Sequence, residues 1–335
     1  MILNLDLKAN SYDIIIERGA LKKASEYLDL DRKVLIVTDD LVPEGYADAL
    51  AAQCFRPVIH TIPHGEESKS ISLFGELLGV MLENGFTRKD CVAAVGGGVV
   101  GDLAGFSASA YMRGIDFYNI PTTVLSQVDS SIGGKTAVNF KGIKNIVGAF
   151  YQPKKVLIDP DLLSTLSKRQ LSNGLAEALK MSLTSDEGLF EIFENGDPFS
   201  EIDTVIYRSL LIKKAVVEKD EKESGLRRIL NFGHTLGHGI ESVKEPELFH
   251  GECVALGMLP MCSKETYERL LPVYKKLGLK TSADFDIQRA LSAVMHDKKS
   301  EKDRIRVIMV DAPGSYHEDF IDADTALSLL SLVHD

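Results

Sequence analysis

A change of hydrophobic pattern near residue 158 constrains the fold of this chain more than any other feature of its sequence. Before that point, short β-branched runs alternate with longer amphipathic segments, a pattern typical of βαβ units. The runs predicted as strands cover 12–16, 33–38, 57–62, 91–95 and 155–158. Apolar residues at three- and four-residue steps predict a helix over 70–83. The first part of the chain is therefore expected to form a parallel sheet covered by helices.

Beyond residue 158 the helical period dominates. Apolar residues recur at helical spacing from Pro160 to about Met295, and only 306–310 reads as a late strand. We interpret the glycines at 174, 196, 225 and 251 as joints between helices. The expected fold is thus a Rossmann-like α/β domain in 1–158 followed by a mainly α-helical domain in 159–335. A ligand site is expected in the cleft between them.

Charge and composition exclude several classes of partner. The chain has 38 Lys and Arg against 49 Asp and Glu, a net charge of −11, so no broad basic surface is expected and nucleic acid is not a predicted partner. No apolar run approaches the roughly 18 to 20 residues of a membrane span, and Asp6 interrupts any signal-peptide core. We therefore expect a cytoplasmic protein that does not bind membranes. Its four cysteines show no CxxC spacing and are interpreted as packing residues.

A glycine-rich segment, GGGVVGD at 96–102, follows the strand predicted over 91–95 and precedes a helix predicted over 103–111. It fits the GxGxxG pattern of turns that bind a pyrophosphate at a helix N-terminus. A tight turn that needs glycine at positive φ would explain the same residues. Spacing alone selects Asp116 as the acid that binds a ribose, and Asp39 and the loop 64–69 are the alternatives.

A second glycine pair, in GGKT at 133–136, resembles the end of a nucleotide-hydrolysing loop. The position five residues before Gly134 holds Asp129 rather than glycine. Without that glycine the loop cannot wrap a phosphate in the usual way, so this function is not expected.

Three histidines indicate a metal site. His234 and His238 lie one helical turn apart, and His250 follows near a glycine. Thr235 replaces the glutamate of HExxH, which argues against a metallopeptidase. Glu177, on the otherwise apolar side of a helix, could supply a carboxylate, or could instead pair with Lys180. Two imidazoles and one carboxylate leave coordination positions open, as in a catalytic site.

Several cations stand next to glycine, asparagine or apolar residues rather than in charged runs. They are Arg113, Lys135, Lys144, Lys180, Lys213 and Arg227. Each alone would be interpreted as a solvated surface charge. As a set they indicate a substrate that carries phosphate or carboxylate.

Together these motifs resemble the 3-dehydroquinate synthase family of the shikimate pathway. The matching segments follow the family's order and cover 96–102, 111–114, 121–123, 129–136, 144–145, 176–177, 220–221, 225–227, 230–235 and 250–252. The resemblance implies an enzyme that binds NAD and zinc, or cobalt in place of zinc, and that forms a homodimer.

The resemblance also implies a role for individual residues. NAD would be held by Asp39, Glu66, Lys69, Gly98, Val99, Val100, Gly101, Asp102, Thr122 and Thr123, together with Lys135 and Lys144. The metal would be held by Glu177, His234 and His250. The substrate and its chemistry would be served by Arg113, Asp129, Lys135, Lys144, Asn145, Lys180, Lys213, Arg227, Asn231, His238 and Lys298, with Lys299 as an alternative to Lys298. Arg113 would reach the phosphate, with a dimer interface as one route.

The implied reaction converts 3-deoxy-D-arabino-heptulosonate 7-phosphate to 3-dehydroquinate and phosphate. It proceeds by transient oxidation by NAD, loss of phosphate, re-reduction and an intramolecular aldol closure. His238 is the protein group implied as general acid or base, and the departing phosphate is the alternative proton acceptor. Three other readings remain open: a related cyclase for another sugar phosphate, a metal-dependent polyol or alcohol dehydrogenase, and a catalytically silent NAD-binding regulator.

Overall fold

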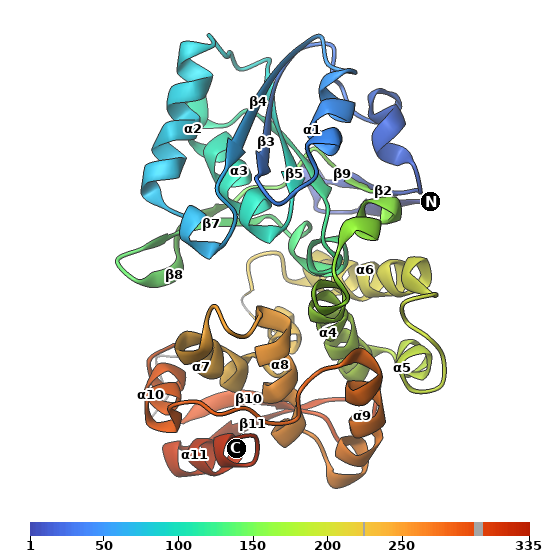
Figure 1. Ribbon diagram of the computed structural model, residues 1–335, viewed down its shortest axis with the longest axis vertical. Helices are drawn as coiled ribbons and strands as arrows, with labels where there is room; N and C mark the ends of the chain where they lie inside the picture. Colours follow the sequence, from blue (N-terminus) through green and yellow to red (C-terminus); the bar gives the residue numbers. More distant parts are fainter. Residues whose placement is uncertain (224, 298–303) are drawn as a thin grey trace. The chain divides into compact units, whose positions relative to one another are not determined.

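A computed structural model describes residues 1–223, 225–297 and 304–335 (Figure 1). The chain divides into two compact units, Met1–Leu166 and Ser167–Asp335. The first contains a mainly parallel sheet with helices and the second is mainly helical, which confirms the expected fold class. Among the described residues, no helix has both the length and the apolar content needed to cross a bilayer.

The sheet of the first unit has seven strands in the order β1-β2-β9-β6-β5-β3-β4. Only β1 is antiparallel to its neighbour, and the other pairs are parallel. The strands are β1 Ile2–Leu5, β2 Tyr12–Ile16, β3 Lys33–Asp39, β4 Arg56–Ile62, β5 Cys91–Gly96, β6 Asp116–Pro121 and β9 Lys155–Ile158. All five predicted strands are present, with ends shifted by at most one residue, whereas β1 and β6 were not predicted.

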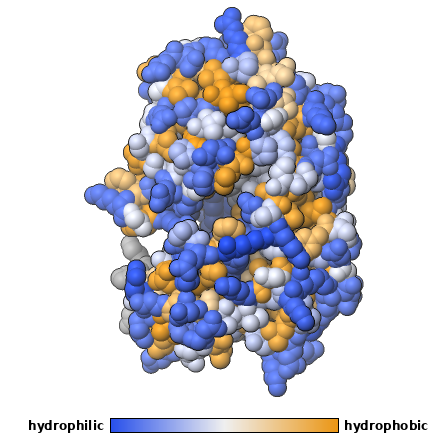
Figure 2. Space-filling model, in the orientation of Figure 1, coloured by the Kyte–Doolittle hydropathy of each residue, from blue (hydrophilic) through white to orange (hydrophobic). Residues whose placement is uncertain are grey.

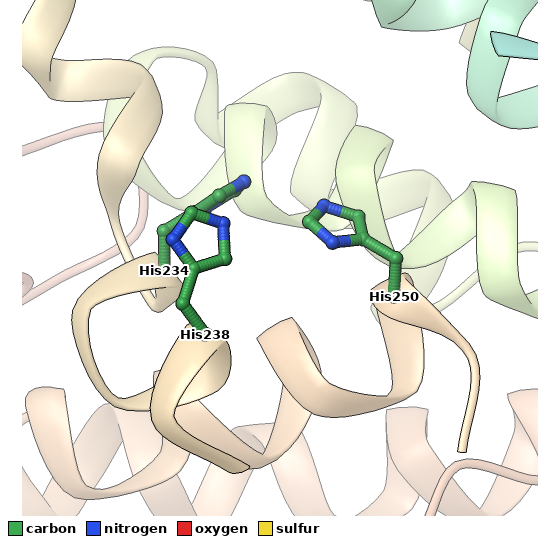
Figure 3. A group of neighbouring side chains, drawn as sticks. All are labelled: His234, His238 and His250. Carbon is green, nitrogen blue, oxygen red and sulfur yellow. The ribbon is translucent and has the colours of Figure 1, made fainter. Parts of the chain in front are cut away.

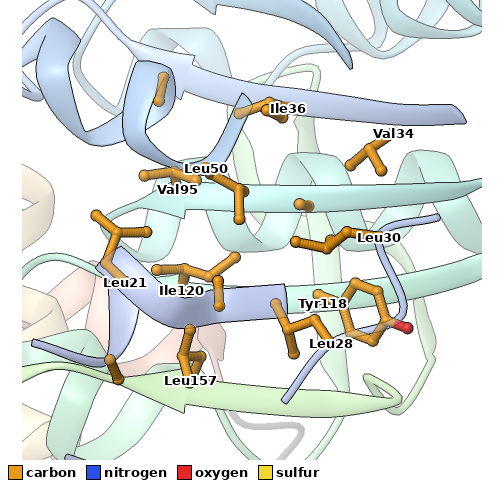
Figure 4. Close-up of a cluster of buried hydrophobic side chains, with 14 of the residues drawn as sticks. Leu21, Leu28, Leu30, Val34, Ile36, Leu50, Val95, Tyr118, Ile120 and Leu157 are labelled. Atoms are coloured by element: carbon orange, nitrogen blue, oxygen red, sulfur yellow. The ribbon is translucent and has the colours of Figure 1, made fainter. Parts of the chain in front are cut away.

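Alternate residues of the central strands enter different hydrophobic cores. Val34 and Ile36 of β3 pack in a cluster with Leu50 of α1 (Glu44–Ala51), as Figure 4 shows. Leu35 and Val37 point to the opposite face, toward α2 (Ile71–Glu83) and α3 (Gly98–Ala110). Because both faces are covered, the central strands read as continuous apolar runs rather than as alternating ones.

A hairpin of two further strands, β7 (Lys135–Phe140) and β8 (Ile143–Phe150), also belongs to the first unit. Its register shifts between Val138 and Phe140, which marks a bulge at Asn139. Four of its apolar side chains are exposed: Phe140, Ile143, Ile146 and Phe150. This hairpin was not predicted, because β8 has no buried face to give it an apolar period.

The second unit contains eight α-helices: α4 Lys168–Ser185, α5 Glu187–Glu194, α6 Ile202–Lys219, α7 His234–Lys244, α8 His250–Met258, α9 Lys264–Leu277, α10 Ile287–Asp297 and α11 Ala323–Ser331, counted over its described residues. The late strand predicted over 306–310 is β10 (Ile305–Met309). It pairs with β11 (His317–Ile321), which was not predicted because four of its five residues are exposed.

Two of the glycines predicted to separate helices lie inside helices instead. Gly174 is within α4, and Gly251 is the second residue of α8. A Cβ atom at Gly251 would lie 2.0 Å from the backbone oxygen of Asn173, so glycine allows α8 to approach α4 closely. The joint interpretation was wrong at both positions.

The cysteines are free, as predicted. Cys91 and Cys253 are buried, and Cys54 and Cys262 are partly buried. Burial raises the pKa of Cys91 and of Cys262 to about 12, so both thiols stay protonated near neutral pH. On the face in view, hydrophobic patches interrupt a largely hydrophilic surface (Figure 2).

Candidate active site

The glycine-rich segment forms the start of α3 rather than a turn before it. Gly97 is the residue before the helix, and Gly98 begins it, five residues before the helix predicted over 103–111. Positive φ occurs at none of the glycines of this segment, which are Gly96, Gly97, Gly98 and Gly101. The alternative explanation, a tight turn that needs glycine at positive φ, was therefore wrong. Close packing explains them instead.

Neighbouring side chains occupy the space that a Cβ atom would need at these glycines. At Gly96 it would lie 2.6 Å from Cγ2 of Val100, and at Gly98 it would lie 3.1 Å from Oγ of Ser130. At Gly97 it would meet Cγ2 of Thr123 at 3.3 Å. Glycine thus brings the helix start against the segment that follows β6, and this leaves backbone N–H groups of the first turn available to an anion.

The neighbouring segment contains the two predicted threonines. Thr122 directly follows β6, and its N–H donates to the backbone oxygen of Gly96 at 2.9 Å. The Thr123 and Ser126 hydroxyls lie 2.7 Å apart. Predicted cofactor residues from the ends of β5 and β6 therefore meet at the carboxyl edge of the sheet, where α/β folds bind ligands.

The structure distinguishes the alternative ribose acids. Asp39 is the last residue of β3, at this same carboxyl edge, and its Oδ1 accepts hydrogen bonds from the N–H groups of Leu41 and Val42. Asp116 begins β6 at the opposite edge, where its Oδ2 pairs with Nη1 of Arg32 at 2.7 Å. Its position separates Asp116 from the helix start of α3, so Asp39 and the loop 64–69 remain the candidates.

A buried lysine joins several predicted residues. Lys69 is 5% exposed, and its Nζ lies 2.7 Å from Oδ2 of Asp102 and 3.6 Å from Oε1 of Glu66. It also donates to Oδ1 of Asn145 in β8. The loop before α2, the start of α3 and the hairpin thus converge on one ammonium group.

Asn139, at the bulge of β7, was missed from the sequence and completes this network. Its side-chain N–H donates to Oε1 of Glu66 at 2.8 Å, while its Oδ1 accepts from the N–H of Asn145 at 2.8 Å. Its backbone N–H donates to the oxygen of Lys69 at 2.7 Å. An isolated asparagine in a strand-like run carries no sequence signal of such a role.

The remaining predicted residues of the first unit lie in short helical segments and on the hairpin. Asp129 is in the π-helix Ser126–Ser130, Lys135 begins β7, and Lys144 is exposed in β8. Arg113 is exposed, and its backbone φ of 68° is unusual for a residue other than glycine. GGKT leads into a strand rather than into a helix, so it does not form a nucleotide-hydrolysing loop, as predicted.

The three histidines of the second unit gather as their spacing predicts. His234 and His250 are the first residues of α7 and α8, and His238 lies one turn into α7. Each offers a ring nitrogen, and these nitrogens all lie within 4.8 Å of one another. Figure 3 shows the imidazoles of His234 and His238 facing that of His250.

Glu177, in the middle of α4, lies at the same place. Its Oε1 is 3.6 Å from Nε2 of His234 and 3.5 Å from Nε2 of His250. These separations are long for hydrogen bonds, and no donor in the described part of the chain satisfies this buried oxygen. Two ligands on one tetrahedral zinc ion lie about 3.3 Å apart, given bonds of about 2.0–2.2 Å. The residues therefore fit a metal ion.

The charges around Glu177 set the protonation states of this site. Burial alone would lower the pKa of His250, but Glu177 and Glu241 on its two sides raise it to about 10, so a metal ion has to displace a proton from this ring. Burial alone would raise the pKa of Glu177, but Lys180, with Nζ 2.5 Å from Oε2, and the histidines lower it well below its usual value. Burial and the charge of Lys180 also lower the pKa of His234, which favours the neutral ring that binds metals. Glu177 therefore forms the ion pair with Lys180 that was the alternative interpretation, and its other oxygen is at the same time placed as a metal ligand would be.

The remaining predicted substrate residues of the second unit lie on α4, α6 and the segment before α7. Lys180, Lys213 and Arg227 are all buried, which is rare for such side chains unless they have partners. Nη1 of Arg227 donates to the backbone oxygen of Glu221 at 2.6 Å, and Asn231 donates to Oε1 of Glu223 at 3.2 Å. Lys298 and Lys299 lie outside the described residues.

Solved structures first define the class of fold. The chain resembles 2-deoxy-scyllo-inosose synthase complexed with carbaglucose-6-phosphate, NAD+ and Co2+, with a TM-score of 0.89, 24% identity and 99% of each chain covered. It also resembles 2-epi-5-epi-valiolone synthase from Streptomyces hygroscopicus with NAD+ and Zn2+ bound, with a TM-score of 0.86, 29% identity and 97% and 98% coverage. A probable glycerol dehydrogenase from Sinorhizobium meliloti is more distant, with a TM-score of 0.62, 18% identity and 95% of each chain covered. The fold is thus one shared by 2-deoxy-scyllo-inosose synthase, 2-epi-5-epi-valiolone synthase and a probable glycerol dehydrogenase.

Sequence comparison then identifies the family. The 3-dehydroquinate synthase N-terminal model matches 59–173, and the C-terminal model matches 174–300. The 3-dehydroquinate synthase of Streptococcus thermophilus is 40% identical over 337 residues, covering 94% of this chain and 95% of the relative. That of Alkaliphilus metalliredigens is 41% identical, covering 94% of each. The chain belongs to the 3-dehydroquinate synthase family.

Proposed function

We propose that this protein is a cytoplasmic 3-dehydroquinate synthase, a carbon–oxygen lyase that converts 3-deoxy-D-arabino-heptulosonate 7-phosphate to 3-dehydroquinate and phosphate. The observation that carries the proposal is the placement of Oε1 of Glu177 against Nε2 of both His234 and His250, in a chain of this family. Residues 1–158 would bind NAD, and 159–335 would bind the metal and most of the substrate.

The N-terminal part of the site would bind NAD through the first turn of α3 and through polar side chains around it. The N–H groups of Gly98, Val99 and Val100 are suited to the pyrophosphate, whereas the N–H of Gly101 already donates to the oxygen of Gly97 at 3.0 Å. Asp39 would accept hydrogen bonds from a ribose, and Lys69 would hold Glu66 and Asp102 in place. When bound, NAD supplies a reversible hydride acceptor, so that the overall conversion involves no net oxidation.

The metal would be held by Glu177, His234 and His250, with zinc or cobalt as the ion. When bound, it supplies Lewis-acid stabilisation of an oxyanion. The protein's cations, Lys135, Lys144, Lys180, Lys213 and Arg227, would neutralise the phosphate and carboxylate of the substrate. His238, whose ring lies 5.1 Å from that of His234, would move the proton.

The protein would act as a homodimer. The hairpin exposes Phe140, Ile143, Ile146 and Phe150, each between 45% and 58% accessible in the single chain. Large apolar side chains gathered on one element favour an interface. A second copy of the chain, as the resemblance implies, would cover them, and would bring Arg113 into use as a phosphate contact.

One assay tests the function. We expect the purified protein to release one phosphate from each heptulosonate phosphate molecule, with NAD needed only in catalytic amount and 3-dehydroquinate as the product. Accumulation of one NADH per turnover would instead show a dehydrogenase. Turnover of another sugar phosphate, but not of this one, would show a related cyclase.

A further inference from the structure

His250 makes contacts through both of its ring nitrogens. Nε2 lies 3.5 Å from Oε1 of Glu177, and Nδ1 lies 3.1 Å from Oε2 of Glu241, a residue of α7. The carboxylate of Glu241 is only 13% exposed, so water competes little for it. Glu241 was not among the residues that the sequence indicated.

His234 shows the same arrangement with a different partner. Its Nδ1 lies 3.1 Å from the backbone oxygen of Phe232, and its Nε2 faces Glu177 at 3.6 Å. An ionised carboxylate and a carbonyl oxygen can only accept hydrogen bonds. Both partners therefore hold a proton on Nδ1, so that Nε2 of each ring is the nitrogen left to bind a metal ion.

Close packing of α7 on α8 holds Glu241 in this position. A Cβ atom at Gly237 would lie 3.0 Å from the backbone oxygen of Cys253 and 3.0 Å from Cα of Val254, both in α8. Glu241 lies four residues after Gly237, so both belong to the face of α7 that approaches α8. The backbones thus fix where the carboxylate meets His250.

We propose that Glu241 is a positioning residue that fixes the tautomer and the orientation of His250, so that its Nε2 is prepared to bind the metal. This inference rests on the proposed function, because it requires that Glu177, His234 and His250 bind a metal ion. Partners of this kind behind a metal-bound histidine typically contribute about 10- to 100-fold to metal affinity. His234 receives the equivalent support from the main chain, which substitution cannot remove, so Glu241 is the part of this arrangement that mutation can test.

The test compares the zinc affinity of the full-length wild type with that of Glu241→Ala and Glu241→Gln, by competition with a chromophoric chelator. We expect Glu241→Ala to weaken zinc binding about 10- to 100-fold. Glu241→Gln should lose less, since the amide oxygen can still accept from Nδ1. Glu247→Ala is the matched control: this exposed glutamate pairs with Lys244, not with a histidine, and its removal should leave zinc affinity unchanged.

A second measurement keeps the inference testable if the alanine variant folds poorly. Nitrogen-15 NMR of the zinc-loaded wild type should show His250 bound through Nε2 with a proton on Nδ1, and Glu241→Gln should weaken the hydrogen bond of that proton. Wild-type zinc affinity in Glu241→Ala, or zinc bound through Nδ1 of His250 in the wild type, would overturn the inference. If the wild type itself binds no zinc, the proposed metal site fails, which is a different outcome.

Discussion

Oε2 of Glu177 and Nζ of Lys180 lie 2.5 Å apart along one face of α4, and each side chain is only 1% exposed. An ion pair of this kind is costly to break, because removing one partner leaves the other charge buried. The same carboxylate turns its second oxygen toward two histidines. Stability and metal binding therefore depend on one residue.

We predict that Glu177→Gln lowers the free energy of unfolding of the metal-free protein by about 3–5 kcal/mol, the usual cost of breaking a buried pair. Urea denaturation followed by circular dichroism measures this. The double variant Glu177→Gln with Lys180→Met should recover part of the loss. If the single variant were as stable as the wild type, the pair would not be buried as described.

Two glycines in helix interiors should respond to alanine in opposite directions. At Gly105 of α3, a Cβ atom would lie 2.6 Å from Cγ2 of Thr136 and 3.0 Å from Cε1 of Phe117, so Gly105→Ala should destabilise by about 1–3 kcal/mol. At Gly75 of α2 there is nothing within 4 Å, so Gly75→Ala should stabilise by about 0.5–1 kcal/mol. Thermal melts of both variants measure the sign, and equal shifts would contradict the packing of α3.

Asn139→Ala should weaken NADH binding, because Glu66 loses a donor and the N–H of Asn145 loses its acceptor. A hydrogen bond of this kind typically contributes about 0.5–1.5 kcal/mol. A titration followed by NADH fluorescence should show an affinity lower by at least about fivefold. Asn10→Ala, at an exposed asparagine, is the control and should bind as the wild type does. Equal affinities would show that the network does not support the cofactor site.

The pair of Glu194 and Arg269 joins α5 to α9 through two contacts, at 2.7 and 2.8 Å. Hydrogen bonding from Arg269 lowers the pKa of Glu194 below its usual 4.5. A carboxyl group with a lowered folded pKa stabilises the fold above about pH 4.5, and loses that contribution as the pH falls through the lower value.

We therefore predict that the stability difference between the wild type and Glu194→Gln is present near neutral pH and shrinks as the pH falls below 4.5. Urea titrations at a series of pH values measure it. A difference that stays constant over this range would mean that the pair does not lower the pKa.

Local patterns made part of this structure predictable. The buried runs of β3 and β5 were visible because both of their faces pack on helices. The spacing of His234 and His238 placed both on one side of a helix, and the structure adds His250 beside them. Glu177 stood out as an acid in an apolar stripe, and its assignment as a ligand came from the family resemblance.

Other parts depend on contacts that no local pattern records. Asn139 acts through a bulge in β7 and through Asn145, whose φ is 55°, and neither the bulge nor this conformation has a strong residue signature. Glu241 looks like an ordinary polar residue of α7 until α8 is packed against it. The sequence left two explanations open for the glycines of α3, a pyrophosphate-binding motif and a turn at positive φ, and the structure rules out the second, since packing rather than positive φ requires them.

The central claim is that Glu177, His234 and His250 bind one divalent ion. Crystals of the zinc-loaded protein, measured at the zinc absorption edge, test this directly. We predict a single anomalous peak within about 2.0–2.2 Å of a carboxylate oxygen of Glu177 and of Nε2 of His234 and His250, with His238 outside the coordination sphere. A peak bound by His234, His238 and His250 without Glu177, or no peak among these residues, would contradict the account.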